Sequence, residues 1–216
     1  MFFRLARIVV WKRYKAIYLR VPKVANTSIR HSFGAGEKRR AYLAFLRRRY
    51  PNQLIFSFVR NPWSRLVSTY RHKILTEKIS NVHYIDGVHR GFVKWGFPFR
   101  VGMSFEEFAE FVCALPDAKT EKHLRSQCYF LVHRGLLVPQ FIGRLESIAR
   151  DWGELCGKVG ANVELVHYQR TDGLPYPTYY SPHVVNLVGD RYREDVVRFG
   201  YQFDPLAKLP PLDVTG

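Results

Sequence analysis

Cysteine is scarce in this chain, and its placement excludes several kinds of site. Only three cysteines occur among 216 residues, at positions 113, 128 and 156. Three scattered cysteines make neither a disulfide framework nor a CxxC metal site, and an odd number fits a reducing compartment. We therefore expect the three thiols to be buried apolar groups, and we expect no metal site.

Long apolar runs are also missing. A membrane-spanning helix needs about 20 consecutive apolar residues, whereas the N-terminal segment MFFRLARIVVWKRYK interrupts its apolar residues with arginines. No small-residue cleavage site follows that segment, so it is not typical of a signal peptide. We interpret it as a basic surface helix or strand, with peripheral membrane association at most.

Acidic residues are few, because 18 Asp and Glu stand against 34 Lys and Arg, for a formal net charge of +16. This balance predicts anionic partners: nucleotides, acidic or sulfated glycans, nucleic acid or an acidic membrane face. Core material is plentiful, since 47% of the residues are hydrophobic and 15% are aromatic. We expect a single folded domain over residues 1–216.

Strand-like and helix-like segments alternate along the chain, which predicts an α/β fold with a mostly parallel sheet. The apolar runs AIYLRV (16–21) and LIFSFV (54–59) are typical of buried strands. Further strands are expected at 139–145 and 163–168. Helices are expected from about residue 27 and at 37–49, 60–74, 105–114, 120–132, 146–159 and 181–199. Residues 80–104 follow no period, which favours a functional or mobile segment.

The sequence PKVANTS, residues 22–28, follows the first predicted strand and leads into a helix. A loop in this position offers backbone N–H groups to an anion, and Lys23 adds a positive charge. Ala25 is small enough to admit a ligand closely, and Asn26 tolerates the left-handed backbone that such loops often need. The Walker pattern GxxxxGK[ST] is absent, because here the lysine precedes the small residues. We expect a cradle for a phosphate or sulfate group.

A second motif, FSFVRNPWSRLVSTY (56–70), contains the next strand and the helix after it. Arg60 lies at the end of the strand, and the Asn-Pro pair that follows is favoured as N-cap and first residue of a helix. Ser64 and Ser68 are four residues apart and share one face of that helix. A guanidinium and a hydroxyl aimed at one spot are what a second phosphate requires.

Together the two motifs resemble those of the sulfotransferases that use 3′-phosphoadenosine-5′-phosphosulfate (PAPS), particularly the carbohydrate-type, family 2-like enzymes. That family has a PK-x-(G/A)-x-TS loop after its first strand and an (F/V)-x-R-(D/N)-P-x-x-R-x-x-S segment. The segments HLRSQCYFL, FIGRLESIARDW and YYSPHVVNLVGDRYREDVVRFGYQF also look like the family. The resemblance covers most of the chain and is least at residues 80–118. It implies a P-loop-like, three-layer α/β domain, in which 80–118 forms an acceptor-binding or mobile insertion.

By this resemblance, the loop would hold the 5′-phosphosulfate, and Lys23 would stabilise the charge that develops on the leaving phosphate. Arg60 and Ser68 would bind the 3′-phosphate. The reaction would be in-line sulfuryl transfer to an acceptor hydroxyl, with 3′,5′-adenosine bisphosphate (PAP) as product and without a metal or covalent intermediate. The expected donor-binding residues are Lys23, Val24, Ala25, Asn26, Thr27, Ser28, Arg60, Ser68 and Arg170.

A general base should reach the acceptor hydroxyl, and His123 is the first candidate. In the segment EKHLRSQ it occupies a position where many family members carry a histidine followed four residues later by glutamine. Glu121 and Arg125 are close enough in sequence to tune it. The alternative is that His123 and Gln127 hold substrate or cap a helix.

Other candidates for the site remain open. His72 is the runner-up for the base, because it lies two turns beyond Ser64 on the same helix face. His83 and His89 are in the irregular segment, where surface histidines are the simpler interpretation. Arg144 and Glu146, at a strand end, could take part in catalysis or form a salt bridge that serves packing. A late loop could close over the adenosine or pack on the body of the domain, and its candidate residues are Arg170, Tyr179 and Tyr180.

The acceptor is expected to be an acidic or neutral glycan. Rings and cations of the irregular stretch suit a carbohydrate, although core aromatics leave a similar pattern; they are Tyr84, Lys94, Trp95, Phe97, Phe99 and Arg100. A small-molecule or lipid alcohol is the alternative acceptor. A nucleic-acid-binding module without transferase activity would also suit the charge, but no helix-turn-helix, zinc ligand set or RNP motif occurs. Animal relatives in the secretory pathway carry a membrane anchor, and no such segment is expected in this sequence, so we expect a bacterial-type cytoplasmic enzyme.

Overall fold

The computed structural model describes residues 4–74, 77–166 and 174–207. The chain forms two compact units, and each is assembled from two separate stretches. Residues 1–60 and 125–170 make the first unit, and residues 61–124 and 171–216 make the second. The chain therefore passes from one unit to the other after residues 60, 124 and 170.

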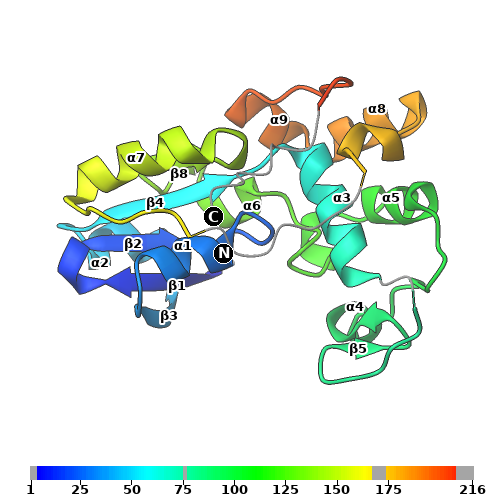
Figure 1. Ribbon diagram of the computed structural model, residues 1–216, viewed down its shortest axis with the longest axis horizontal. Coiled ribbons are helices and arrows are strands. Elements are labelled where there is room, and N and C mark those ends of the chain that lie inside the picture. The colour runs from blue at the N-terminus through cyan, green and yellow to red at the C-terminus, as the bar shows by residue number, and fades with distance from the viewer. Residues whose placement is uncertain (1–3, 75–76, 167–173, 208–216) are drawn as a thin grey trace, which may run out of the picture. The chain divides into compact units, whose positions relative to one another are not determined.

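A five-stranded sheet with the order β3-β1-β2-β4-β9 organises the first unit (Figure 1). Its strands are β1 (Leu5–Trp11), β2 (Ala16–Leu19), β3 (Glu37–Tyr42), β4 (Leu54–Val59) and β9 (Phe141–Arg144). β1 pairs antiparallel with β2 and β3, whereas β4 pairs parallel with β2 and β9. Four of these five strands thus run in one direction, which confirms the α/β class and the mostly parallel sheet.

The centre of this sheet is buried on both faces. All residues of β2 and residues 55–59 of β4 are buried, which is why both strands are apolar apart from Ser57, whose hydroxyl donates a 2.7 Å hydrogen bond to the Leu19 carbonyl. Gly143 of β9 lies directly opposite Phe58, and a Cβ atom at Gly143 would come within 2.3 Å of the Phe58 ring. Glycine at this position therefore lets the large ring fill the space between β4 and β9.

Helices and one small hairpin complete the first unit. They are α1 (Asn26–Ser32), α2 (Leu46–Arg49), α6 (Cys128–Leu131), α7 (Ile148–Val159) and the hairpin of β7 (Val132–His133) and β8 (Leu136–Leu137). α7 packs against β9. The ring of Phe33, just after α1, lies 4.8 Å from Trp152 of α7 and 5.9 Å from Phe56 of β4. These aromatic contacts fix α1 and α7 on the same face of the sheet.

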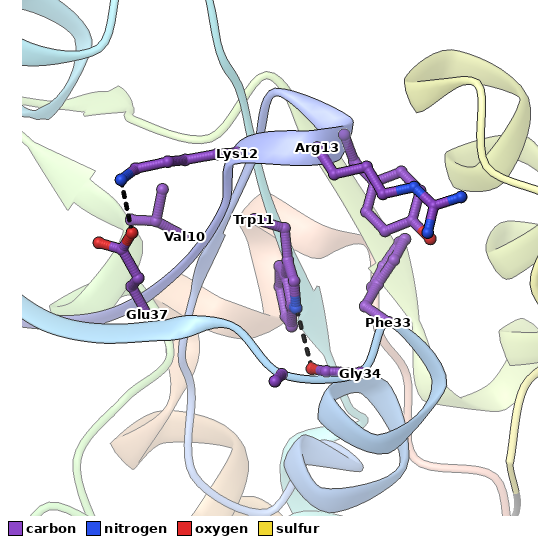
Figure 2. Close-up of a pocket in the computed structure, with 9 residues that line it drawn as sticks. Val10, Trp11, Lys12, Arg13, Phe33, Gly34 and Glu37 are labelled. Carbon is purple, nitrogen blue, oxygen red and sulfur yellow. Dashed lines mark hydrogen bonds and ion pairs between the residues drawn. The ribbon is translucent and has the colours of Figure 1, made fainter.

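A pocket of about 450 Å³ lies where α1 ends (Figure 2). Trp11 forms its floor and donates a 3.1 Å hydrogen bond from Nε1 to the Gly34 carbonyl, while Lys12 and Glu37 form a 2.7 Å ion pair at its rim. None of the residues proposed from the sequence for donor binding or catalysis lines this pocket. It lies at the amino end of β2, whereas the PKVANTS loop follows the carboxyl end.

Residues 37–49 do not form the helix that their pattern predicts. Residues 37–42 are strand β3, a 3₁₀ turn follows at Leu43–Phe45, and α2 has only four residues. β3 pairs with β1 along its whole length and is the edge strand of the sheet. Edge strands commonly carry exposed charged side chains, so the run of Lys and Arg fits a strand here. Pairing with β1, whose residues are 27 to 37 positions earlier in the chain, therefore overrides the helical pattern of the sequence.

Two further predicted elements are shorter than expected or absent. In place of a helix over 120–132, only α6 is helical, because the Glu121 side chain bonds the His123 backbone and so competes with helix formation. Residues 163–166 form no strand, and 167–168 lie outside the described residues. The Val163 carbonyl accepts a 2.8 Å hydrogen bond from the Trp152 ring N–H, so a side chain takes a group that strand pairing would need.

Four main helices form the second unit: α3 (Pro62–Lys73), α5 (Phe105–Cys113), α8 (Pro182–Arg191) and α9 (Arg193–Phe199). α3 and α8 both pack on α5 and on each other. Their boundaries follow local caps, as expected: the Asn61 side chain accepts hydrogen bonds from the Trp63 and Ser64 N–H groups, and Ser104 and Glu107 form a capping box on α5.

The irregular stretch 80–104 contains a hairpin of β5 (Tyr84–Ile85) and β6 (Val88–His89), followed by α4 (Arg90–Lys94). Two of its aromatic residues, Phe92 and Phe99, pack as core, since both are buried and their rings lie 5.0 Å apart. Trp95 differs, because 44% of its surface is exposed. Only part of the aromatic composition is therefore available for binding a ligand.

None of the three cysteines forms a disulfide. Cys128 and Cys156 are buried and Cys113 is half-buried, as expected for apolar packing groups. Burial raises the pKa of the Cys113 thiol to about 12. Across residues 4–74, 77–166 and 174–207, no helix is both long and apolar enough to cross a bilayer.

Candidate active site

The PKVANTS loop begins two residues after β2 and passes directly into α1. Its apolar residue, Val24, is fully buried, and so is Ile29 in the first turn of α1. Asn26, the first residue of α1, donates a 2.5 Å hydrogen bond from Nδ2 to the Val21 carbonyl. This bond ties the end of the loop to its beginning, while the two buried residues anchor it to the core.

Two residues of this loop have left-handed backbones, Lys23 with φ of 71° and Ala25 with φ of 57°. The sequence suggested Asn26 for such a conformation, but Asn26 is already helical. A left-handed backbone is unfavourable for residues other than glycine by about 1–2 kcal/mol. Turns of this kind direct successive N–H groups to one side and form concavities that bind anions, and strain of this kind is typical of functional sites. The loop thus fits a phosphate or sulfate group.

Arg60 lies directly after β4, and its backbone is held on both sides by one side chain. Gln127 accepts a 2.8 Å hydrogen bond from the Arg60 N–H and donates a 2.8 Å hydrogen bond to the Arg60 carbonyl. Gln127 is fully buried and completes the pairing of the strand end. Gln127 is at the N-cap position of α6, but its side chain makes no cap hydrogen bond there. A contact with substrate, the other role that its sequence position suggested, stays a prediction. Lys23 and Arg60 thus follow the carboxyl ends of adjacent parallel strands in one unit.

On α3, Ser68 is buried and Ser64 is half-buried. The motif arginine between them, Arg65, is also buried, although sequence reasoning gave it no role. Burial lowers the pKa of its guanidinium, and the nearby Tyr192, Asp195 and Asp117 partly offset that effect. Arg65 is therefore part of the interior of the second unit, and its spacing within the second motif was the only sign of its importance.

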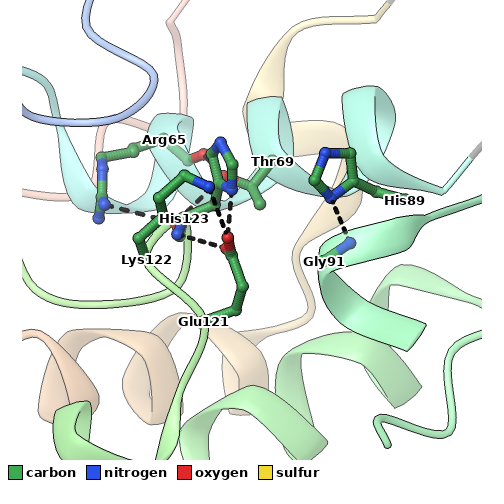
Figure 3. Close-up of polar contacts among 7 residues, drawn as sticks. All are labelled: Arg65, Thr69, His89, Gly91, Glu121, Lys122 and His123. Atoms are coloured by element: carbon green, nitrogen blue, oxygen red, sulfur yellow. Dashed lines mark hydrogen bonds and ion pairs between the residues drawn. The ribbon is translucent and has the colours of Figure 1, made fainter. Parts of the chain in front are cut away.

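His123 lies in the second unit, where Glu121 holds its ring (Figure 3). One carboxylate oxygen of Glu121, Oε2, is 2.7 Å from His123 Nδ1 and accepts a 2.7 Å hydrogen bond from the His123 backbone N–H. The other oxygen, Oε1, forms a 3.0 Å ion pair with Lys122. An ionised carboxylate only accepts hydrogen bonds, so the proton is assigned to Nδ1 and the lone pair to Nε2.

The backbone of His123 is fixed from another side. The Arg65 guanidinium and the Thr69 hydroxyl, both on α3, donate to the His123 carbonyl at 3.4 Å and 3.5 Å (Figure 3). Thr69 is fully buried and the His123 side chain is only 13% exposed. The ring is thus positioned through both its own nitrogen and its main chain.

Burial is also the main cause of the protonation state of this centre. It lowers the pKa of His123 to about 4, although the Glu121 carboxylate acts in the opposite direction. Burial alone would raise the pKa of Glu121, but hydrogen bonds from the His123 ring and backbone, with Lys122 nearby, bring it below its ordinary value. At neutral pH, His123 is therefore an uncharged imidazole beside an ionised carboxylate.

A second histidine adjoins this centre. The His89 ring lies 5.6 Å from the His123 ring, and its Nδ1 accepts a 3.1 Å hydrogen bond from the Gly91 N–H. Burial and the nearby Lys73 lower the pKa of His89 to about 4. His72, the runner-up base, is on α3 and its carbonyl accepts a 2.8 Å hydrogen bond from the Tyr84 hydroxyl. His83 is exposed.

The late-loop tyrosines pack on the body of the second unit. The Tyr180 hydroxyl donates a 2.9 Å hydrogen bond to the Trp63 carbonyl, and the Tyr179 ring lies 5.6 Å from that of Phe105. This matches the packing alternative for both residues. Arg170, proposed for the donor site, lies outside the described residues.

The end of β9 reveals a residue that sequence reasoning missed. The buried Asp151 of α7 accepts a 2.7 Å hydrogen bond from the Arg144 N–H and a 2.9 Å hydrogen bond from the Ser147 hydroxyl. Burial opposes its ionisation, but the hydrogen bonds from Arg144 N–H and Arg150 bring the pKa of Asp151 below its ordinary value. Asp151 stabilises the turn after β9, and no sequence signal distinguished it from Glu154, the other acidic residue of α7.

Comparison with known proteins assigns the chain to a family. In the part of the chain that the structure describes, no group of three or more His, Cys, Asp or Glu could hold a metal ion. Neither a curated protein nor a solved structure matches the sequence. A family model described as Sulfotransferase family matches residues 6–202, which include parts of both units. With most of its length covered by that match, the chain belongs to the sulfotransferase family.

Proposed function

We propose that this sulfotransferase transfers the sulfuryl group of PAPS to a hydroxyl of a carbohydrate acceptor and releases PAP. One observation carries the choice of donor. The left-handed Lys23 loop and Arg60 follow the carboxyl ends of two neighbouring parallel strands, β2 and β4, whose spacing is about 4.8 Å. Ligands of α/β sheets bind at this edge, and a donor with phosphate groups at both ends needs two cationic sites there.

In this proposal the loop of residues 22–28 binds the phosphosulfate. The N–H groups around Ala25 and the hydroxyls of Thr27 and Ser28 donate hydrogen bonds to its oxygens. Lys23 stabilises the negative charge that develops on the phosphate as the bond from sulfur to the bridging oxygen breaks. The small side chain of Ala25 leaves room for that oxygen to approach the backbone.

Arg60 and Ser68 bind the 3′-phosphate in this proposal. A guanidinium can donate two parallel hydrogen bonds to a phosphate, which an ammonium does not match. Because Gln127 fixes both backbone groups of Arg60, the guanidinium extends from a rigid point. This arrangement supports selection of PAPS over nucleotides that lack a 3′-phosphate.

We assign the general base to His123. Its Nε2 takes the proton of the acceptor hydroxyl while the hydroxyl oxygen forms a bond to sulfur and the bond from sulfur to the 5′-phosphate oxygen breaks. Glu121 keeps the proton on Nδ1 and stabilises the imidazolium that forms. The low pKa of His123 keeps the ring uncharged over the whole neutral range, so the Nε2 lone pair is not occupied by a proton there.

The same topology supports a P-loop-like, three-layer classification, since a parallel strand, a phosphate-binding loop and a helix follow one another at β2 and α1. The family match includes parts of both units, which supports one catalytic domain over residues 1–216. Within it, we propose that residues 80–118 bind the acceptor, and the exposed Trp95 and Lys94 are suited to a sugar ring and its polar groups.

A glycan is favoured over a small-molecule or lipid alcohol because Trp95 offers an exposed ring beside a cation rather than an enclosed apolar cavity. We place the reaction in the cytoplasm of a bacterial-type cell, an assignment supported by three cysteines of which none forms a disulfide. No nucleic-acid partner is proposed.

The test uses thermal unfolding with PAP. PAP should raise the melting temperature by several degrees, AMP should not, and Arg60→Ala should abolish the PAP effect. Arg48→Ala, which removes an exposed cation of α2, is the matched control and should keep it. Equal stabilisation by AMP and PAP would contradict the 3′-phosphate site. Transfer of radiolabelled sulfate from PAPS to polysaccharides, lipids and simple alcohols would then identify the acceptor.

A further inference from the structure

The register of the sheet places three arginines in one row. Arg40 of β3 is directly opposite Arg7 of β1. Ile8 is opposite Leu19, so the next pair along joins Arg7 to Arg20, and the Arg20 N–H donates a 3.1 Å hydrogen bond to the Arg7 carbonyl. Residues directly opposite one another project from the same face of a sheet. The row Arg40–Arg7–Arg20 therefore crosses three neighbouring strands of the first unit.

More polar groups adjoin this arginine row. Lys38 lies two residues before Arg40 on β3. Burial is the largest cause that lowers the pKa of Arg20, and the nearby charges of Arg30 on α1 and of Arg7 lower it further. A groove of about 290 Å³ lies here, lined by Arg7, Ile8, Arg20, Lys38, Arg39 and Arg40. Four of its lining residues carry cationic side chains on this face of the sheet, and no carboxylate lines it; they are Arg7, Arg20, Lys38 and Arg40.

Two buried donors in this region have no hydrogen-bond acceptor among the described residues: the Tyr18 hydroxyl and Nε of Arg20. Arg20 lines the groove, whereas Tyr18 is fully buried and does not. Tyr18 lies opposite Val9, which is itself opposite Lys38, so it occupies the row adjacent to the arginines on the same face. A buried polar group without a partner is destabilising by about 1–3 kcal/mol, and such groups in native structures often mark a ligand position.

The charges of the row are also not neutralised within the described chain. None of the ion pairs there joins Arg7, Arg20 or Arg40 to a carboxylate. Arg39, one residue from Arg40 and on the other face of β3, does pair with Glu37. Like charges directly opposite in a sheet repel one another, so the row is stable only at a cost that a bound anion would remove.

We propose that the arginine row binds the anionic groups of an acidic oligosaccharide, so that the acceptor of this sulfotransferase is itself negatively charged. The proposal rests on the proposed function. Only two residues separate Arg20 from Lys23, so the row begins beside the donor loop. It spans two strand spacings, roughly 10 Å, which is long enough for more than one carboxylate or sulfate group.

The chemistry of the row selects this class of ligand. Guanidinium groups donate paired hydrogen bonds to carboxylate and sulfate oxygens. Arg20 lines the groove and its Nε has no acceptor among the described residues. A discrete anionic group on a chain provides such an acceptor, and a flat bilayer surface does not. A neutral glycan would leave the repulsion between the arginines as it is.

The test measures binding of fluorescent oligogalacturonate of eight sugars, with a neutral malto-oligosaccharide of the same length as reference. The variant Arg7→Gln/Arg40→Gln should bind oligogalacturonate at least tenfold more weakly. The variant Arg48→Gln/Arg49→Gln removes the same charge from exposed positions of α2 and should stay within about twofold of the wild type. Equal losses in both variants would show general charge attraction and overturn the proposal.

A second variant changes no charge. Arg20→Lys keeps the cation but removes the Nε donor of the groove, so oligogalacturonate binding should weaken several-fold. Unchanged affinity would overturn the part assigned to Arg20. Tighter binding of an eight-nucleotide single-stranded DNA, or of phosphatidylglycerol vesicles in flotation, would overturn the assignment to a glycan.

The PAP melting shift separates the two proposals, and it should be unchanged in all of these variants. A normal PAP shift with no specific effect of Arg7→Gln/Arg40→Gln would overturn the arginine row alone. A missing PAP shift in the wild type would overturn the donor assignment and, with it, the role of the row in binding an acceptor.

Discussion

The loop over residues 22–28 and the cluster around His123 control charge in different ways. The loop relies on backbone conformation, with left-handed residues at Lys23 and Ala25 and one lysine side chain. The cluster relies on buried side chains, in which Glu121 holds the His123 ring and Arg65 holds its carbonyl. Anion binding by a backbone loop requires that each residue can adopt its φ and that its side chain is small enough. The function of a side-chain cluster requires the particular donor and acceptor atoms of each residue. Substitutions in the cluster should therefore affect turnover, whereas substitutions in the loop should affect donor binding and, at Lys23, turnover as well.

The largest expected effect tests this division at His123. His123→Ala should lower kcat by roughly a thousandfold, since it removes the proposed base, while the PAP melting shift remains. His183→Ala, at an exposed position of α8, should leave kcat within about twofold of wild type. The assay is sulfate transfer to the acceptor found by the screen. Loss of the PAP shift in His123→Ala would contradict the separation of binding from turnover.

The next effect tests the support of Arg60. Gln127→Leu removes two hydrogen bonds to the Arg60 backbone and should lower the free energy of unfolding by about 2–4 kcal/mol, measured in urea. PAP affinity should also fall. Gln140→Leu is the matched control, because Gln140 accepts one hydrogen bond from Ile55 at the other end of β4. Gln140→Leu should lower the free energy of unfolding by less than Gln127→Leu and should leave PAP affinity unchanged. A larger loss of stability or of PAP affinity in Gln140→Leu would contradict the role of Gln127.

A pH series tests the His123 centre more finely. With a pKa of about 4, His123 stays uncharged as the pH falls from 8 to 5, so kcat/KM should be flat over this range. Protonation, and loss of rate, should begin only as the pH approaches 4. Glu121→Gln should lower the rate roughly tenfold to a hundredfold. The Glu121 carboxylate raises the pKa of His123, so its removal should not shift the acidic pH at which the rate falls to a higher value. A rate that halves near pH 6.5 would contradict the buried base.

The smallest effect concerns the backbone of the loop. Ala25→Gly relieves the left-handed strain and should raise the free energy of unfolding by about 0.5–1 kcal/mol, with the PAP shift kept. Ala149→Gly, on the exposed side of α7, should instead destabilise by about 1 kcal/mol. Urea unfolding of both variants checks the sign, and destabilisation by Ala25→Gly would show that the loop is not strained.

Local signals made much of the fold predictable. The strands β2 and β4 are apolar runs apart from Ser57, and the start of α3 follows from the capping chemistry of Asn61 and Pro62. Non-local pairing was not predictable, because β3 has a sequence that suits a charged helix until β1 pairs with it. The conformation of loop 22–28 and the position of Arg60 at the end of a strand depend on residues nearby in sequence, so the motifs were enough to predict both.

The rest of the site depends on partners that are distant in the chain. Gln127 meets Arg60 across 67 residues, and Arg65 meets the His123 carbonyl across 58. No periodicity or spacing in one sequence links these pairs. Glu121 was identifiable as a neighbour of His123, but its bond to Nδ1 follows from the turn that replaces the expected helix.

Each compact unit contains two separate stretches of the chain, and this has a consequence for biosynthesis. The sheet lacks β9 until residue 144 has been made, and the helical unit lacks α8 and α9 until residue 199. A nascent chain that ends near residue 124 would hold half of each unit and expose the apolar faces of β4 and α5. Completion of both units is therefore delayed until residue 199 has left the ribosome, and chaperones have the longest opportunity to bind the chain in that interval.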